Sequence, residues 1–342
     1  MKKIIIVGAG AMGSVFAVPC LENQNEVTLV GTHLEDNLVE DIQSNNNFHP
    51  ALKIELPSQL KVEKFEKLNL LLKNEVDMIV VGVSSIGIEW FVKQISDNYK
   101  KNLPIVLLTK GLAIVENELM TLSDKIKKLL LEKGHSEVNI SAIKGPCLAA
   151  GLANKMRTGT VIANPKIKQT QLLKRIISTN YYSTEISNDL TGVELSGAIK
   201  NIYSMLIGAS EGLSNSEASK EIQSKYYLNT SASLIHRSVS EMVEFVSHYG
   251  GKTETVYGLA GLGDLYVSAI GGRNSLMGKY LGEGYLYKDA KEKFMKDITV
   301  EGAQLALEIG PKILQDLNPK HFPLMFSMLN TICDNKKLEI DW

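Results

Sequence analysis

Cysteine is scarce in this chain, and its copies lie far apart. The 342 residues include three cysteines, Cys20, Cys147 and Cys333, with no CxxC pair and no histidine pair nearby. An odd, scattered set indicates neither a disulfide framework nor a zinc site, and it fits a reducing compartment. We therefore expect a cytoplasmic protein without a bound metal.

The chain also lacks an excess of charge of either sign. It has 37 basic and 38 acidic residues and no polybasic block, so it carries no electrostatic footprint for nucleic acid or an anionic membrane. Beyond residues 1–20, no apolar run approaches the roughly 18 residues that span a bilayer. These absences favour a small-molecule partner and exclude nucleic-acid binding and a membrane span from the expected functions.

The first twenty residues, MKKIIIVGAGAMGSVFAVPC, allow two interpretations. Two lysines, an apolar run and Cys20 suit an export signal, whereas the same residues suit a strand, a glycine turn and a helix. Three glycines at GxGxxG spacing interrupt the apolar run, and removal of the segment would delete the first strand of the domain that follows. We expect it to remain in the protein as strand, turn and helix.

The rest of the chain divides into two patterns. Short Ile/Val-rich runs bounded by Gly or Pro alternate with helical stretches, which predicts a doubly wound α/β domain with a parallel sheet over residues 1–189. These runs lie at residues 2–8, 26–31, 77–83, 104–111, 138–146 and 159–163. From about residue 190, segments 190–213, 226–250 and 300–316 have helical spacing without a convincing strand, so residues 190–342 are predicted to be an all-helical domain.

The glycine turn after the first strand predicts a dinucleotide site. Gly8 permits the tight turn, Gly10 lets a pyrophosphate approach the backbone, and Gly13 allows close packing of helix on strand. Ala11 and Met12 complete the loop. The motif alone is weak, but its position in a βαβ pattern favours cofactor binding over an incidental turn.

The second strand ends in Gly31-Thr32-His33, where an NAD-specific protein usually has a carboxylate. Thr32 and His33 can tolerate a 2′-phosphate, which favours NADP slightly over NAD, although two ordinary loop residues are an equal alternative. Glu35 and Asp36 follow closely, so NAD stays open as the coenzyme.

Two lysines stand in positions suited to chemistry. Lys110 follows an apolar strand at its carboxyl end, where ligands bind in open α/β sheets, although a surface lysine that ends a strand is an even alternative. Lys200 and Asn201 lie within GVELSGAIKN, a predicted helix rich in small residues. Burial of Lys200 would lower its pKa towards proton transfer, but composition alone slightly favours an exposed side chain.

A glycine-rich stretch, GLAGLGDLYVSAIGGRN at residues 258–274, contains further polar candidates. Asp264 lies on a chain that can approach other backbone closely, and Arg273 and Asn274 stand at a predicted helix start. Arginine with helix N–H groups binds phosphate or carboxylate. A solvated arginine on an interhelical connection is the simpler alternative for this stretch taken alone.

Taken in order, these segments resemble the NAD(P)-dependent glycerol-3-phosphate dehydrogenase family. The resemblance covers about residues 4–303 and includes GAGAMG, LLTKG, GPCLA, GVELSGAIKN, GLAGLGDL, GGRN and VEGA. It implies a Rossmann-type N-terminal domain, a helical C-terminal domain, an active site between them, and reversible reduction of dihydroxyacetone phosphate. The phospholipid glycerol backbone is the implied destination of the product.

The resemblance also implies individual roles. Lys200 is similar to the family's general acid and base, Lys110 to a residue that stabilises the developing alkoxide, and Asp264 to one that orients Lys200. The implied substrate-binding residues are Lys110, Gly145, Asn201, Ser268, Arg273 and Asn274. The implied cofactor-binding residues are Gly8, Gly10, Ala11, Met12, Gly13, Thr32, His33, Lys110, Ala149, Arg273 and Glu301.

Several positions depart from the family pattern. Val83-Ser84-Ser85 stands for Val-Pro-Ser, Cys147 for Ser or Asn, and Ser275 for a basic residue, while segment 214–234 is longer and more polar. These differences allow a rival that acts on another small keto or polyol phosphate. A ketopantoate-reductase-like enzyme and a non-catalytic nucleotide sensor rank lower. We expect a homodimer with a phosphorylated small-molecule substrate.

Overall fold

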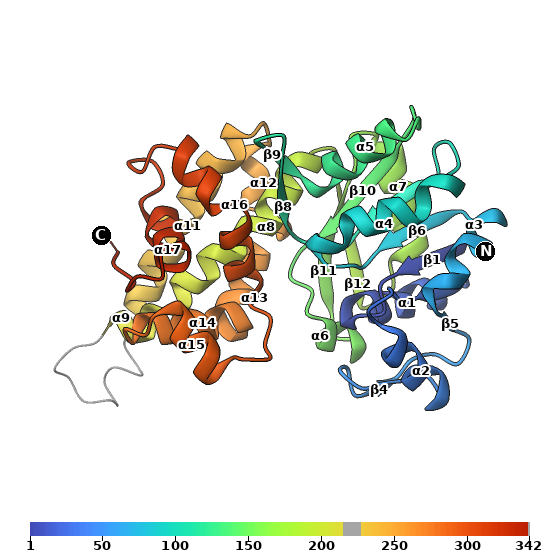
Figure 1. Cartoon of the computed structure of the whole chain (residues 1–342), viewed down its shortest axis with the longest axis horizontal. Coiled ribbons are helices and arrows are strands. Elements are labelled where there is room, and N and C mark those ends of the chain that lie inside the picture. Colours follow the sequence, from blue (N-terminus) through green and yellow to red (C-terminus); the bar gives the residue numbers. More distant parts are fainter. Residues whose placement is uncertain (215–226, 341–342) are drawn as a thin grey trace. The chain divides into compact units, whose positions relative to one another are not determined.

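The computed structural model describes residues 1–214 and 227–340, which form two compact units. The first unit contains residues 1–110 and 121–190, and the second contains residues 111–120 and the described residues from 191 onward. Each unit has its own buried apolar core, and Figure 1 labels most of the helices and strands of both. Within the described ranges, no helix is long and apolar enough to cross a membrane.

An eight-stranded sheet forms the middle of the first unit, in the order β12-β11-β10-β7-β6-β1-β2-β5. The strands are β1 (Lys3–Val7), β2 (Glu26–Val30), β5 (Lys61–Glu63), β6 (Met78–Val81), β7 (Pro104–Leu107), β10 (Asn139–Lys144), β11 (Thr158–Ala163) and β12 (Tyr182–Ser187). A small hairpin, β3 (Phe48–His49) and β4 (Ile54–Glu55), stands apart from it. All six strands expected from the sequence are present.

The sheet is mixed, whereas the sequence predicted a parallel one. Neighbouring strands run parallel except β10 and β11, which are antiparallel. A parallel return needs a crossover that runs back along the strand, and α6 (Ala149–Ala153), with 5 residues, is too short for that. The chain therefore turns directly back into β11.

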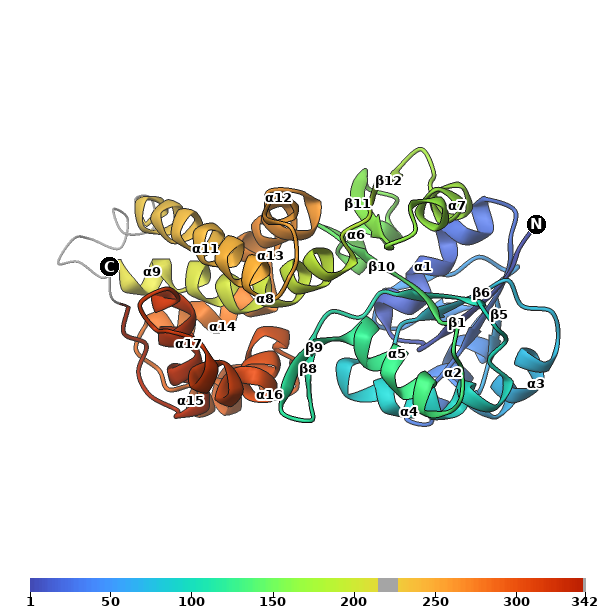
Figure 2. The same ribbon diagram turned by 90° about the horizontal axis from the view of Figure 1, so that it is seen from above.

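Helices cover both faces of this sheet. α1 contacts α6 and α7 on one face, and α4 contacts α3 and α5 on the other (Figure 2). The bounds are α1 (Ala11–Glu22), α2 (Asp36–Ser44), α3 (Leu68–Lys73), α4 (Ile88–Ile95), α5 (Leu122–Glu132) and α7 (Ile167–Ile177), with 3-10 turns η1 (Phe65–Lys67), η2 (Ser85–Gly87) and η3 (Ser96–Asn98). Because both faces are covered, the central strands are apolar throughout: all four residues of β6 are buried.

The strand order creates a switch point beside β1. From β1 the chain moves to β2 and β5 on one side, then returns to β6 on the other side of β1. Gly8 follows β1, and Gly82 follows β6. In open α/β sheets the crevice at the carboxyl ends of such strands is where ligands bind, so the fold places the glycine loop at the expected edge.

The second unit is built around α8 (Leu190–Gly208), which lies between α11 and α16 (Figure 2). Sixteen of its 19 residues are buried, from Gly192 to Ile207. The surrounding helices are α9 (Ser210–Leu213), α11 (Leu228–His248), α12 (Thr253–Val256), α13 (Asp264–Gly271), α14 (Arg273–Gly282), α15 (Tyr287–Phe294), α16 (Glu301–Asp316) and α17 (Pro323–Cys333), with a π-helical turn η4 (Leu259–Gly263) before α13. A helix that is buried on all sides suits the centre of a bundle.

A β-hairpin also belongs to the second unit. β8 (Leu112–Val115) and β9 (Glu118–Thr121) pair with each other, and β8 packs against α16. Leu112 is buried in the helical core. The described residues from 190 onward are helical, as predicted, and the hairpin joins them from a segment far earlier in the chain than α16, the helix that β8 contacts.

Candidate active site

The glycine loop of the first unit has no room for side chains at its turn. A Cβ at Gly8, where φ is +111°, would lie 2.7 Å from the carbonyl carbon of Gly82, and one at Gly13 would lie 2.1 Å from the oxygen of Gly8. Gly10 differs, because among the described atoms only Glu35 Oε1, at 3.7 Å, would come within 4 Å of its Cβ. The loop therefore leaves open space at Gly10, just before α1 begins at Ala11, and this suits a phosphate at a helix N-terminus.

Two side chains hold the loop from the interior. The Ser14 hydroxyl donates to the Ala9 carbonyl at 2.8 Å, and His49 Nε2 lies 3.1 Å from the same oxygen. His49 Nδ1 accepts a hydrogen bond from the Leu52 N–H, which leaves Nε2 to donate to the Ala9 carbonyl. His49 is fully buried. Sequence reasoning missed it, because nothing in its neighbourhood signals contact with a loop forty residues earlier.

The end of β2 places Thr32 beside the same loop. One carboxylate oxygen of Glu35, Oε2, accepts from the Thr32 N–H at 2.8 Å and from the Ala9 N–H at 3.0 Å. The His33 ring packs against Trp90, with ring centroids 5.1 Å apart, and against Phe65 at 6.2 Å. No carboxylate belongs to the strand end itself, but Glu35, which kept NAD open as a coenzyme, folds back onto it from the start of α2.

Lys110, Gly145 and Ala149 follow neighbouring strands of the sheet. The Lys110 ammonium lies 3.5 Å from the Gly145 carbonyl, and Ala149 begins α6, which packs on α1. Lys144, buried at the end of β10, donates to the Thr109 carbonyl at 2.7 Å and so holds the chain just before Lys110. Lys144 lies outside the set of residues that the sequence predicts for the site.

A buried ion pair lies at the centre of the second unit. Lys200 Nζ, on α8, lies 2.9 Å from Asp264 Oδ1, and the two side chains are 4% and 2% exposed. Lys200 also donates to the hydroxyl of Ser268, one turn after Asp264 on α13. The prediction that the Lys200 side chain is exposed, which composition slightly favoured, is thus wrong. A buried ammonium requires a charged partner, and Asp264 supplies it.

A second polar chain leads from the neighbouring residue towards the surface. The Asn274 amide donates to Asn201 Oδ1 at 2.9 Å and accepts from the Gly302 N–H at 2.9 Å. Asn201 in turn donates to Glu301 Oε2 at 3.4 Å. The other Glu301 oxygen accepts from Arg273 at 3.0 Å, and the Arg273 side chain is 56% exposed.

The helices that carry these residues approach at backbone contact. A Cβ at Gly278 on α14 would lie 1.9 Å from the Met205 carbonyl of α8, and one at Gly302 on α16 would lie 2.4 Å from the Asn201 carbonyl. The middle of α14 and the start of α16 are therefore held against the C-terminal half of α8. This explains why Asn201, Arg273, Asn274 and Glu301 converge although they are far apart in sequence.

The structure also places two of the departures from the family pattern. The Ser275 hydroxyl donates to the Ala269 carbonyl at 2.6 Å, and its backbone lies against Gly208, so this residue contributes to helix packing. Cys147 is half-buried in the turn between β10 and α6. Most of the polar segment 214–234, residues 215–226, lies outside the described residues.

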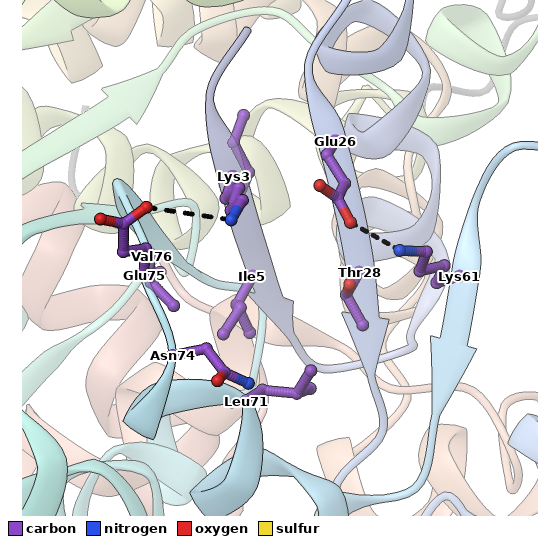
Figure 3. A pocket seen from close by; sticks show the side chains of 10 residues that line it. Lys3, Ile5, Glu26, Thr28, Lys61, Leu71, Asn74, Glu75 and Val76 are labelled. Atoms are coloured by element: carbon purple, nitrogen blue, oxygen red, sulfur yellow. Dashed lines mark hydrogen bonds and ion pairs between the residues drawn. The ribbon is translucent and has the colours of Figure 1, made fainter.

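A hollow of about 380 Å³ on the first unit is a different feature (Figure 3). It lies near the amino ends of β1 and β2, where ion pairs join Lys61 to Glu26 at 2.5 Å and Lys3 to Glu75 at 4.0 Å. Ligands in this fold bind at the carboxyl ends of the strands. The hollow is therefore not part of the candidate site.

The structure thus gathers the predicted residues into two groups. The first unit holds the glycine loop, Thr32 and His33, together with the strand ends that carry Lys110, Gly145 and Ala149. The second unit holds the Lys200 pair and the chain from Asn201 to Arg273. A doubly wound sheet with a glycine loop at its switch point, followed by a helical unit with a buried lysine, is typical of two-domain NAD(P)-dependent oxidoreductases.

Comparison with known proteins narrows this class to one family. The family model described as NAD-dependent glycerol-3-phosphate dehydrogenase N-terminus matches residues 3–170, and the model of the C-terminus matches residues 189–340. The chain therefore belongs to the NAD-dependent glycerol-3-phosphate dehydrogenase family, as its motifs predicted.

Individual relatives are similar to this chain over nearly its full length. The NADP(+)-dependent glycerol-3-phosphate dehydrogenase of Archaeoglobus fulgidus is 32% identical over 98% of this chain and 96% of its own, and the glycerol-3-phosphate dehydrogenase [NAD(P)+] of Mesoplasma florum is 31% identical over 96% and 93%. The crystal structure of glycerol-3-phosphate dehydrogenase from Coxiella burnetii is similar with a TM-score of 0.80 and 27% identity, over 98% of this chain and 96% of that one.

Proposed function

We propose that this chain reversibly reduces dihydroxyacetone phosphate to sn-glycerol 3-phosphate with NADH or NADPH. Family membership supports the reaction, and the names of the relatives support the substrate. The observation that carries the proposal is the buried pair of Lys200 and Asp264, since it holds an ammonium donor in a fixed position among polar side chains.

The first 189 residues are proposed to hold the coenzyme, which supplies a hydride when bound. The loop from Gly8 to Gly13 and the N-terminus of α1 suit its pyrophosphate, because Gly10 faces open space and the first N–H groups of a helix attract anions. Thr32 and His33 lie where the adenosine end belongs in this fold. Ala149 lies on α6, the helix that packs against α1.

Residues 190–342 are proposed to supply the proton and most substrate contacts. Lys200 Nζ donates a proton to the carbonyl oxygen that becomes the new hydroxyl, and it accepts that proton back in the reverse reaction. Asp264 and Ser268 orient its Nζ. Arg273 and the N–H groups at the start of α14 suit the substrate phosphate, because guanidinium has five donors and one bond to Glu301 leaves others for the ligand.

Lys110 is proposed as a second cationic residue in the reaction. It follows β7 at the ligand-binding edge of the sheet, and Lys144 holds the backbone just before it. A positive charge in that place stabilises negative charge that develops on a carbonyl oxygen during reduction.

The function is tested by following coenzyme oxidation with and without dihydroxyacetone phosphate. Oxidation should require the keto phosphate, and Lys200→Met should remove turnover while coenzyme binding persists. Lys320→Met, which removes an exposed lysine of the same unit, is the matched control and should keep full activity. Full activity of the Lys200 variant would overturn the assigned role.

Substrate identity needs a separate comparison, because Ser275 replaces a basic residue of the family. A panel of small keto phosphates should rank dihydroxyacetone phosphate first in kcat/KM. A higher kcat/KM for another keto phosphate would favour the rival substrate. A homodimer and a cytoplasmic location are also proposed, and sedimentation and cell fractionation would test them.

A further inference from the structure

Glu35 stands where the coenzyme's adenosine would be recognised. It precedes α2 and returns to the sheet, so that Oε2 accepts from the N–H groups of Ala9 and Thr32. Its other oxygen lies on the open side of the glycine turn, 3.7 Å from the position of a Cβ at Gly10. One carboxylate thus bridges the loop after β1 and the end of β2.

The free lone pairs of this carboxylate have a defined use in a dinucleotide site. A carboxylate offers about four acceptor positions, and two backbone N–H groups leave the others for a ligand. At the end of the second strand of this fold, an acidic side chain accepts from ribose hydroxyls, whereas a basic one accommodates a 2′-phosphate. Glu35 is an acidic side chain and can accept from ribose hydroxyls, although it comes from the start of α2 instead of the strand end.

The charges around the end of β2 also disfavour a 2′-phosphate. The basic side chain Lys64 donates a hydrogen bond to Glu40 on α2. That bond, with the charges of Glu40, Asp36 and Glu66, raises the pKa of Lys64. Carboxylates therefore outnumber this ammonium, and a 2′-phosphate with a charge near −2 would add to the excess.

The two residues that suggested NADP are otherwise engaged. The Thr32 N–H donates to Glu35 itself. The His33 ring forms an aromatic cluster with Trp90 and Phe65, whose own centroids are 6.1 Å apart. Neither residue supplies the cationic fork that a 2′-phosphate requires.

We propose that Glu35 selects the coenzyme by accepting hydrogen bonds from the adenosine ribose of NAD(H) and repelling the 2′-phosphate of NADP(H). The inference rests on the proposed function only in taking the ligand to be a nicotinamide dinucleotide. It reverses the slight preference for NADP that the sequence suggested, and it makes the native chain an NADH-preferring protein.

The test measures binding without substrate, by titrating the protein with NADH and NADPH and recording nicotinamide fluorescence. Native protein should bind NADH more tightly. Glu35→Gln keeps the acceptor oxygen but removes the charge, so NADPH affinity relative to NADH should rise about tenfold. Asp41→Asn removes an exposed carboxylate from the same helix and should leave the ratio unchanged.

A ratio in Glu35→Gln equal to that of native protein would overturn the inference. If that variant binds neither coenzyme, competition on the native protein decides: 5′-AMP should displace NADH at lower concentration than 2′,5′-ADP, and the reverse order would refute the proposal. Failure of dihydroxyacetone phosphate turnover would count only against the proposed function, because none of these titrations contains a keto phosphate.

Discussion

At the scale of single residues, buried charge determines the candidate site. Lys200 and Asp264 are both almost fully buried, and each is tolerated only because the other compensates its charge. Burial also removes competing water from the ammonium, so its direction is set by Asp264 and Ser268. A proton donor in a fixed direction is what reduction of a ketone requires.

Asp264→Asn should therefore impair catalysis without affecting the coenzyme. The amide can still accept from Lys200 but no longer balances its charge, and we expect kcat to fall by about 100-fold. Dissociation constants for NADH and NADPH should not change, because the glycine loop belongs to the other unit. Asp316→Asn, which removes a surface ion pair with Lys312, is the control and should leave kcat unaltered. Equal losses in both variants would contradict the orienting role.

A second buried carboxylate, Glu241, lies outside the proposed site. It accepts from the N–H groups of Leu324 and Met325 at the start of α17 and from the Tyr203 hydroxyl. Burial raises the pKa of Glu241 from 4.5 to about 7 despite these hydrogen bonds. Between these pH values the unfolded chain releases the proton while the folded chain keeps it. Its contribution to the free energy of unfolding therefore falls as pH rises through this window.

Glu241→Gln should remove that contribution to the pH dependence. From pH 4.5 to 7, the variant should gain roughly 3 kcal/mol of unfolding free energy relative to native protein, as the linkage of a buried carboxyl requires. Urea unfolding of both proteins across this range measures the difference. If the unfolding free energies of the variant and the native protein vary with pH in parallel, Glu241 titrates normally in the folded state.

At the scale of elements, the site depends on how closely helices approach one another. α14 and α16 contact α8 at backbone distance, at Gly278 and Gly302, so the positions of their first residues are coupled to α8. The polar chain from Asn201 to Arg273 exists only at this separation. Side-chain volume at the crossings therefore affects chemistry as well as stability.

Gly278→Ala should disturb both properties. The new methyl group would lie 1.9 Å from the Met205 carbonyl, and overpacking of this kind costs about 1–3 kcal/mol. We expect a lower melting temperature and a raised KM for the keto phosphate. Gly271→Ala adds the same methyl group where no described atom lies within 4 Å, so it should be neutral in thermal unfolding. Equal melting temperatures for the two variants would contradict this packing.

At the scale of the whole molecule, the chain crosses between the two units three times. It leaves the first unit after Lys110, forms the hairpin of the second unit, returns at Thr121 and leaves again after Leu190. Residues 111–120, which directly follow the proposed catalytic residue Lys110, thus belong to the helical second unit. We therefore expect the stability of the second unit to depend on a segment outside residues 190–342.

Leu112→Ala tests this dependence. Leu112 is 1% exposed within the core of the second unit, and its truncation should lower the unfolding free energy by about 2–4 kcal/mol. Leu307→Ala, at a position 49% exposed, should change it little. A residue 190–342 fragment should bind a hydrophobic dye more strongly than the intact chain. Equal stability of the two leucine variants would refute the role of the hairpin.

The two units differ in how much of their fold and of the candidate site could be predicted from the sequence. Local signals were strong for the strands, the glycine loop and the helices α8, α11 and α16, because each follows from periodicity and turn residues within a short window. The short β8–β9 hairpin and the polar edge strand β12 gave weak signals. The antiparallel turn at β11 depended on the length of a helix that the sequence does not delimit sharply.

The sequence by itself determined the family, the main strands and helices and the residues capable of chemistry, because motifs depend on residue type and local spacing. The tertiary structure alone decided that Lys200 is buried against Asp264, that His49 supports the glycine loop and that Glu35 reaches the end of β2. The reason is physical: burial, charge pairing and hydrogen bonding depend on atoms brought together from distant parts of the chain, and no local pattern records which distant group will arrive.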